Sequence, residues 1–294
     1  MVNSTESRRA VSIDPRTVMG TVALTVSDLA RSREFYERAI GLQATDNVDG
    51  TLVLSAAGGR PLVELRGDSS AQGLDRHATG LYHLAILLPS RLDLAFALAR
   101  LAEARWPLDG ASDHLVSEAL YLSDPDGNGI EIYRDRPREQ WRQAEGQLEM
   151  ATLPLDLNDV LGELSRATEP QREPPAGTTM GHVHLQVADI AAAEAFYHGV
   201  LGFDVMVRSY PGALFVSAGG YHHHIGLNVW QSYRSGPPAP GSIGLRSFEV
   251  QLPDGEALDA VIDRVRAAGI PAAHRDGATL VRDPSGNGVV LTTR

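Results

Sequence analysis

The chain contains no cysteine, which excludes disulfide bonds, thiolate metal sites and thiol catalysis. It also lacks positive net charge: 26 basic and 37 acidic side chains give a formal net charge of -11, which argues against nucleic acid or an anionic membrane as the main partner. No stretch approaches the roughly 18 consecutive apolar residues of a membrane-spanning helix, and the polar first 18 residues have no apolar run typical of a signal peptide. These absences predict a cytoplasmic protein that binds neither nucleic acid nor membrane.

Two segments of the chain, Met19–Gly41 and Met180–Gly202, repeat one pattern. In each, an alternating strand leads to an aspartate typical of a helix N-cap, then to an amphipathic helix with Phe-Tyr, and finally to a glycine. Where the first copy has Thr21, the second has His182. A repeated scaffold with ligand-type side chains in only some copies indicates one metal site on a duplicated frame.

Two further units follow the same plan with diverged sequence. Each ends in strands joined by the motif Asp-Pro-x-Gly-Asn-Gly, which begins at Asp124 in one unit and at Asp283 in the other. Proline presets one torsion of a tight turn, and glycine or asparagine accepts positive φ. The sequence therefore predicts an α+β chain of four βαβββ modules, near residues 17–66, 79–134, 179–230 and 243–294.

The modules are expected to form an N-terminal half over 17–134 and a C-terminal half over 179–294. Between them, the segment 135–178 is polar and becomes rich in proline near its end. Within this segment Asp156–Ser165 could form one short helix. The segment is interpreted as a linker or arm, and no chemistry is assigned to it.

Four βαβββ modules with these strand–helix and turn motifs resemble the vicinal oxygen chelate superfamily, which includes glyoxalase I, antibiotic-resistance proteins and extradiol ring-cleaving dioxygenases. The resemblance covers all of the chain except the N-terminal tail and the linker. Four modules in one chain are most similar to the catechol-2,3-dioxygenase branch. The resemblance implies paired modules that form two half-open barrels, with a metal ion on a concave inner face.

The resemblance also implies a triad of two histidines and one carboxylate on Fe(II), with Mn(II) as an ion that suits the same ligands. The family's ligand positions fall on His83, His182 and Glu131 of this sequence. Module four has Ser247 and Val290 at the positions that match His83 and Glu131. The full ligand set therefore exists only if modules two and three face each other, so we expect that pairing.

Strand periodicity agrees with this assignment. Side chains alternate along a strand, so His182 and His184 share one face, and the apolar residues between them share the other. His83 and Glu131 likewise alternate with apolar neighbours. The apolar faces can pack under the helices and leave the histidine face open to a cavity, although His184 is a rival to His182 on that face.

A second run of ligand-type residues is Tyr221-His-His-His-Ile-Gly-Leu-Asn. The resemblance places the family's acid/base histidine at His223, where it would take a proton from the catechol and later return one. Strand alternation predicts that His222 and His224 face opposite to His223, and neither has an assigned role. The alternative interpretation is a surface site that scavenges metal ions.

Two more residues match active-site positions of the extradiol enzymes. Tyr121 lies ten residues before Glu131, where the family has a tyrosine that donates a hydrogen bond to bound substrate. Its alternative interpretation is an aromatic residue of the core. His114 matches another active-site histidine, with a register two residues short that the loop before the strand could absorb.

The activity implied by the resemblance is extradiol (meta) cleavage of a catechol-type diol by dioxygen, giving a ring-opened semialdehyde in aromatic hydrocarbon catabolism. One alternative is a glyoxalase-like metalloenzyme, although such enzymes typically replace one histidine by a second carboxylate. Another is a metal-free protein that binds an aromatic compound or antibiotic. Exposed edge strands on half-open barrels further predict a homo-oligomer. Which catechol or hydroquinone is cleaved is left open by the sequence.

Overall fold

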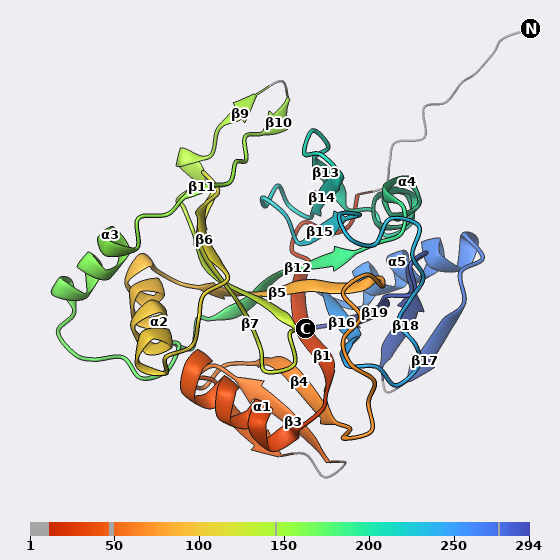
Figure 1. Ribbon diagram of the computed structural model, residues 1–294. Helices are drawn as coiled ribbons and strands as arrows, with labels where there is room; N and C mark the ends of the chain where they lie inside the picture. Colours follow the sequence, from red (N-terminus) through yellow and green to blue (C-terminus); the bar gives the residue numbers. More distant parts are fainter. Residues whose placement is uncertain (1–11, 47–49, 145, 276) are drawn as a thin grey trace, which may run out of the picture.

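The computed structural model describes residues 12–46, 50–144, 146–275 and 277–294, which form the four βαβββ modules that the sequence predicts (Figure 1). Module one consists of β1 (Val18–Val26), α1 (Leu29–Phe35), the π-helical turn η1 (Tyr36–Ile40), β2 (Gln43–Asp46), β3 (Thr51–Ser55) and β4 (Pro61–Gly67). Module two consists of β5 (Gly80–Leu88), α2 (Arg91–Glu103), β6 (Gly110–Asp113), β7 (Ser117–Ser123) and β8 (Gly129–Asp135).

The second half of the chain repeats this order. Module three consists of β12 (Thr179–Gln186), α4 (Ile190–Glu194), the π-helical turn η4 (Ala195–Val200), β13 (Asp204–Val207), β14 (Ala213–Ser217) and β15 (Ile225–Asn228). Module four consists of β16 (Gly244–Leu252), α5 (Gly255–Ala267), β17 (Ala272–Arg275), β18 (Ala278–Arg282) and β19 (Gly288–Thr293). The α+β fold with four βαβββ modules is therefore confirmed.

The strands form two large mixed sheets, and each sheet combines one module from either half of the chain. One has the order β17-β18-β19-β16-β1-β4-β3-β2, and the other the order β11-β6-β7-β8-β5-β12-β15-β14-β13. The joins are antiparallel pairs, β1 with β16 and β5 with β12. Modules two and three thus share a sheet, which confirms the pairing expected from the distribution of ligand-type residues. The division into halves at 17–134 and 179–294 stays a prediction.

The helices cover the outer faces of the sheets. In Figure 1 the strands β1, β5, β12 and β16 lie at the centre, and α1, α2, α4 and α5 lie around them. On β5, Leu84 and Ile86 are buried in the main hydrophobic core with Leu94 and Leu98 of α2. Because side chains alternate along a strand, the opposite face of β5 carries His83 and is directed away from this core.

The helix starts follow from capping side chains. Asp28, Ser90, Asp189 and Asp254 each accept a hydrogen bond from a backbone N–H in the first turn of α1, α2, α4 and α5. Such a cap satisfies one of the exposed amide donors at a helix N-terminus. The expected structural role of Asp28 and Asp189 is confirmed.

The two Asp-Pro-x-Gly-Asn-Gly turns bind modules together inside each half of the chain. Asp124 accepts hydrogen bonds from the backbone and side-chain nitrogens of Asn128, and it is 3.4 Å from the buried Tyr36 hydroxyl of module one. In the other half the Tyr197 hydroxyl donates to Asp283 at 2.9 Å. The Phe-Tyr and Asp-Pro motifs found in the sequence therefore meet in space.

The segment 135–178 contributes short elements: η2 (Arg138–Gln140), β9 (Gln143–Ala144), β10 (Gln147–Leu148), β11 (Leu153–Pro154), α3 (Leu157–Gly162) and η3 (Glu163–Arg166). The strand β11 extends the nine-stranded sheet beside β6. The helix expected in this segment is present as α3 with η3, and Asp156 caps it. Part of the expected linker thus belongs to the sheet that carries the histidines.

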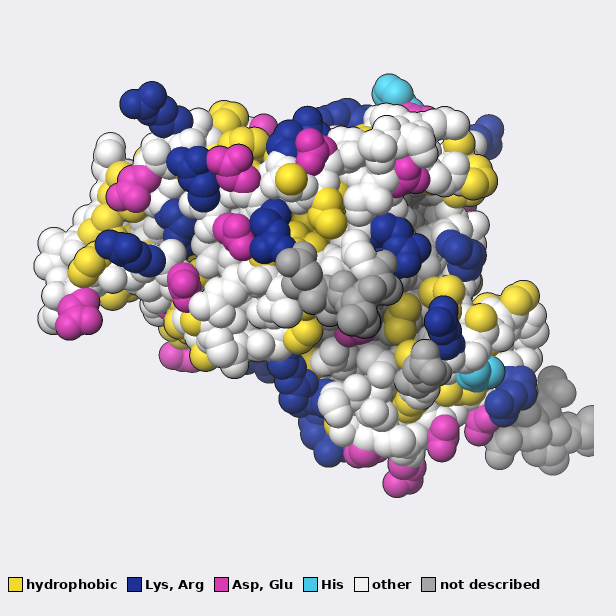
Figure 2. All heavy atoms as spheres, turned by 90° about the horizontal axis from the view of Figure 1, so that it is seen from below, with side chains coloured by type: hydrophobic (Ala, Val, Ile, Leu, Met, Phe, Trp, Pro, Cys, Tyr) yellow, Lys and Arg dark blue, Asp and Glu magenta, His cyan; other side chains and the backbone are white. Residues whose placement is uncertain are grey.

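The outer surface is mixed in character. On the face shown in Figure 2, acidic and arginine side chains are interspersed among scattered hydrophobic ones. Isolated hydrophobic side chains of this kind are ordinary on protein surfaces. Among the described residues, none of the helices is both long enough and apolar enough to cross a lipid bilayer.

Candidate metal centre

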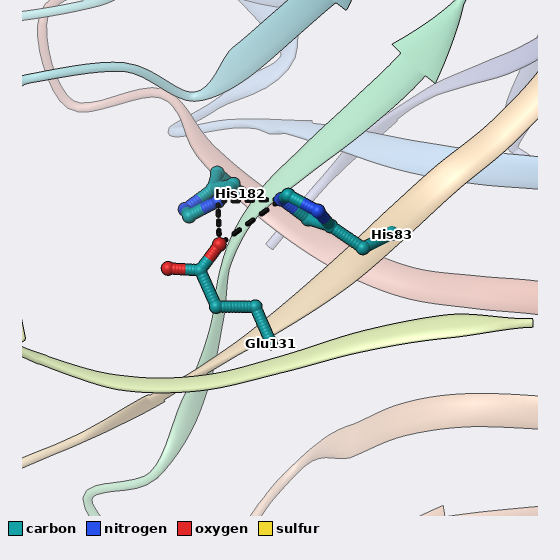
Figure 3. Close-up of side chains that lie close together, drawn as sticks. All are labelled: His83, Glu131 and His182. Carbon is teal, nitrogen blue, oxygen red and sulfur yellow. Dashed lines mark hydrogen bonds and ion pairs between the residues drawn. The ribbon is translucent and has the colours of Figure 1, made fainter. Parts of the chain in front are cut away.

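Three neighbouring strands bring His83, Glu131 and His182 together (Figure 3). His83 lies on β5, Glu131 on β8 to one side of it, and His182 on β12 to the other. Glu131 Oε2 is 3.0 Å from His83 Nε2 and 3.1 Å from His182 Nε2, and the two Nε2 atoms are 3.4 Å apart. All three side chains are buried, so these donor atoms converge on one point inside the protein.

The small side chain of Ala85 explains how the triad can form. Ala85 is the register partner of Glu131 on β8 and also of His182 on β12, so it lies between them in the sheet. Its methyl group is fully buried and leaves room for the two longer side chains to meet above it. His83 lies two residues earlier on the same face of β5 and completes the group.

The protonation states of the triad suit a metal ion. Burial alone would raise the pKa of Glu131, but the adjacent His182 and His83 outweigh it and hold that pKa well below its ordinary value. Burial lowers the pKa of His182 to about 4 despite the opposing effect of Glu131. At neutral pH the carboxyl group is therefore ionised and the His182 imidazole is neutral, as metal ligands must be.

A large cavity opens onto the triad. It has a volume of about 1290 Å³ and is lined by side chains that include His83, Glu131, Tyr121, His114, His184 and His223. This volume lies above the range of roughly 300–1,000 Å³ that is typical of small-molecule sites. The face of the sheet that carries the histidines is therefore accessible to a ligand.

Tyr121 and His114 form a hydrogen-bonded pair in this cavity. The His114 Nδ1 is 2.7 Å from the Ala151 carbonyl oxygen, and its Nε2 is 2.6 Å from the Tyr121 hydroxyl. Since a carbonyl can only accept, Nδ1 carries the proton and a neutral His114 accepts from Tyr121 through Nε2. Burial, reinforced by the nearby Glu131, raises the pKa of Tyr121 well above its ordinary value and keeps the phenol protonated.

His184 lies beside the triad, as strand alternation predicts. Unlike His182, whose Nε2 contacts Glu131, it interacts with its neighbours mainly through its ring. Its ring packs against those of His83, Tyr82 and Trp230. A Cβ atom at Gly226 would be 2.9 Å from this ring, so only glycine leaves space for it. Among the described residues none forms a hydrogen bond with the buried His184 Nε2.

The run of three histidines departs from the sequence-based expectation. His222, His223 and His224 precede β15, and the Nδ1 atoms of His222 and His223 face each other at 2.8 Å, so strand alternation does not apply to that pair. All three are buried, which also contradicts a surface site for scavenging metal ions. His224 Nδ1 accepts from the Ala218 backbone N–H at 3.1 Å and stabilises the turn.

Asp135 is a polar partner of His222 and Tyr221. The sequence-based interpretation placed it in the linker and gave it no role. It is the last residue of β8, and its Oδ1 lies 2.9 Å from His222 Nε2 and 3.1 Å from the Tyr221 hydroxyl. Glu131, Tyr133 and Asp135 have a spacing of two along β8, so they share one face. That periodicity is the signal that could have found it.

We expect acid to destabilise the fold through His224. Burial lowers the pKa of His224 to about 3 from 6.5, so it stays neutral in the folded state while the unfolded chain takes up a proton below pH 6.5. The contribution to stability is complete above pH 6.5 and is lost as the pH falls from 6.5 towards 3. At pH 5 the loss from this one residue is about 2 kcal/mol.

The measurement is urea unfolding of the chelator-treated protein between pH 7.5 and 5. His224→Asn, which keeps an acceptor for the Ala218 N–H but does not titrate, is expected to show a free energy of unfolding that falls less steeply than that of the wild type. Equal slopes for the two proteins would contradict this assignment.

Comparison with known proteins agrees with this architecture. Residues 18–132 and 179–291 match the Glyoxalase/Bleomycin resistance protein/Dioxygenase superfamily. The chain therefore belongs to this superfamily. A relative from Bacillus subtilis (strain 168), named Catechol-2,3-dioxygenase, is 48% identical over 278 residues, which cover 93% of this chain and 96% of the relative. That identity over almost the whole length places the chain among the dioxygenase enzymes of the superfamily.

Solved structures show the same fold at low sequence identity. The crystal structure of a protein from Bacillus subtilis subsp. subtilis str. 168 has a TM-score of 0.65 at 15% sequence identity. The match covers 96% of this chain and 86% of the chain of that protein. Glyoxalase I from Zea mays has a TM-score of 0.56 at 16% sequence identity, and the match covers 94% of this chain and 92% of the glyoxalase chain. These likenesses concern the arrangement of the modules alone.

Proposed function

We propose that this protein is an extradiol dioxygenase that cleaves a catechol-type diol with dioxygen at one Fe(II) ion, giving a ring-opened semialdehyde. The observation that carries the proposal is the convergence of His83, Glu131 and His182 from three strands onto one point beside a large cavity. The relative named Catechol-2,3-dioxygenase supports the choice of substrate class.

The donor set fits the proposed ion. Two imidazoles and one carboxylate form the set that non-haem Fe(II) oxygenases use, with positions left open for ligands. Metal–ligand bonds of about 2.1 Å at right angles separate neighbouring donor atoms by about 3 Å, and the observed separations are 3.0, 3.1 and 3.4 Å. His83, Glu131 and His182 would hold the ion, and a bound Fe(II) would supply binding positions for the diol and dioxygen and a route for electrons between them. Mn(II) suits the same donors.

The remaining groups of the cavity would handle protons and orientation. His223 lines the cavity, and its ring centroid lies 4.1 Å from that of His182. Burial and the surrounding histidines lower the pKa of His223 well below its ordinary value, so the free imidazole is available to take a proton from the diol. Tyr121 would donate a hydrogen bond to a substrate oxygen once its one hydroxyl proton turns from His114 to the substrate.

The test is oxygen uptake after anaerobic loading of the wild type with Fe(II) or Mn(II). The substrate panel contains catechol, alkylated and carboxylated catechols, and a hydroquinone. We expect oxygen uptake and a yellow ring-opened product from at least one diol. Stoichiometric iron without uptake would contradict the proposal in favour of another metalloenzyme, such as a glyoxalase-like one. Absence of both metal and uptake would instead favour a metal-free binding protein.

A further inference from the structure

A buried chain of hydrogen bonds connects Asp135 to His223 through His222. Asp135 Oδ1 lies 2.9 Å from His222 Nε2, and His222 Nδ1 lies 2.8 Å from His223 Nδ1. The His222 side chain is completely inaccessible to solvent, and His223 is 6% exposed. Both ring nitrogens of His222 are therefore used within the protein, one at each end of the chain.

The carboxylate end of this chain fixes where the protons lie. An ionised carboxylate can only accept hydrogen bonds, so His222 donates to Asp135 through Nε2–H. A neutral imidazole carries only one ring proton, which leaves His222 Nδ1 as an acceptor. His223 must then donate through Nδ1–H, and its Nε2 is left with a free lone pair.

The neighbouring aromatic side chains hold this arrangement in place. The Tyr221 hydroxyl donates to the same Asp135 oxygen at 3.1 Å, and it lies 2.7 Å from the Tyr133 hydroxyl. The His222 ring packs against Tyr221, with ring centroids 4.1 Å apart, and against Trp141, at 5.4 Å. The orientation of His222 is therefore set by these ring contacts as well as by its two hydrogen bonds.

We propose that Asp135 and His222 are positioning residues that fix His223 in the Nδ1–H tautomer, with the Nε2 lone pair available to the cavity. Only in this tautomer can His223 take a proton from a diol through Nε2. The catalytic consequence rests on the proposed function, whereas the tautomer itself is a property of the folded chain.

The direct test is nuclear magnetic resonance of the full-length chain labelled with ¹⁵N in histidine and treated with chelator to remove paramagnetic metal. Long-range ¹H–¹⁵N correlation distinguishes protonated from bare ring nitrogens, and a His223→Gln sample assigns the His223 signals. In the wild type we expect a protonated Nδ1 and a bare Nε2 at His223. A protonated Nε2 there would overturn the proposal.

Three variants separate positioning from general structural support. Asp135→Leu removes the acceptor and is expected to move the His223 proton to Nε2, whereas Asp135→Glu keeps a carboxylate, which can only accept, and is expected to retain the wild-type tautomer. His274→Phe changes an exposed histidine on the edge strand β17 and serves as the control. An unchanged His223 tautomer in folded Asp135→Leu, or in His222→Phe if the first variant does not fold, would overturn the proposal.

Kinetics of the iron-loaded enzyme supply the second readout. Asp135→Leu is expected to lower kcat by about 100-fold or more with a smaller change in KM, and Asp135→Glu, which keeps the carboxylate acceptor, to retain most of the activity. Equal loss in both variants would contradict a role through the tautomer. If the tautomer changes as expected but the wild type consumes no oxygen with any diol, the proposed function fails and the tautomer assignment stands.

Discussion

Replacing Glu131 with alanine is expected to lower the affinity for Fe(II) by more than about 100-fold and to abolish oxygen uptake. Glu131 supplies the sole negative charge of the proposed ligand set and lies within 3.1 Å of both histidine donors. Two neutral imidazoles alone would neither balance the charge of a divalent ion nor complete the triad. The measurement is an anaerobic Fe(II) titration followed by metal analysis of the desalted protein, with circular dichroism to verify folding.

Glu64 provides a matched control for this prediction. It lies on β4, the last strand of module one, and its partner is Arg246 at 3.0 Å instead of a pair of histidines. Module one has Thr21 at the position that His182 occupies in module three. Glu64→Ala is therefore expected to leave iron binding unchanged. Equal loss of iron in both variants would mean that the triad is not the site.

Much of the architecture could be predicted from the sequence because it is encoded by repeated local patterns. The Phe-Tyr helices and the Asp-Pro-x-Gly-Asn-Gly turns occur twice each and mark the module plan. The pairing of modules is a long-range property that no local pattern contains. It could be predicted only because modules two and three have ligand-type residues at the matching positions, whereas module four has Ser247 and Val290 there.

Contacts made outside regular strands were harder to predict. His114 was expected two residues out of register, and the structure accommodates it in a tight turn where Leu115 has a φ of 70° and His114 N–H bonds to the Ser117 carbonyl. Such a left-handed residue is uncommon for leucine and leaves no periodic trace in the sequence. The prediction that His222 faces opposite to His223 was wrong for a similar reason. Both residues precede β15, and their Nδ1 atoms face each other at 2.8 Å.

Gly129→Ala is expected to destabilise the fold by about 3 kcal/mol and to weaken iron binding at least about tenfold. Gly129 is the last glycine of the Asp-Pro-x-Gly-Asn-Gly turn, and a Cβ atom there would lie directly against the Tyr82 carbonyl oxygen and 3.1 Å from the His83 Cβ. Relief of this clash requires β8 to move away from β5. Since Glu131 and His83 lie on these two strands, that movement would separate two of the three proposed ligands.

Gly288 ends the equivalent turn of module four. Its substitution provides a control that distinguishes loss of stability from loss of iron binding. A Cβ atom there would be 2.6 Å from the Arg246 carbonyl oxygen and 3.2 Å from the Ser247 Cβ, which is the same kind of clash between the strands β19 and β16. Gly288→Ala is expected to lower the urea midpoint to a similar extent while iron binding stays at the wild-type level. If instead both variants lost iron in proportion to their loss of stability, the metal site would depend on general stability, and the local role of Gly129 would be wrong.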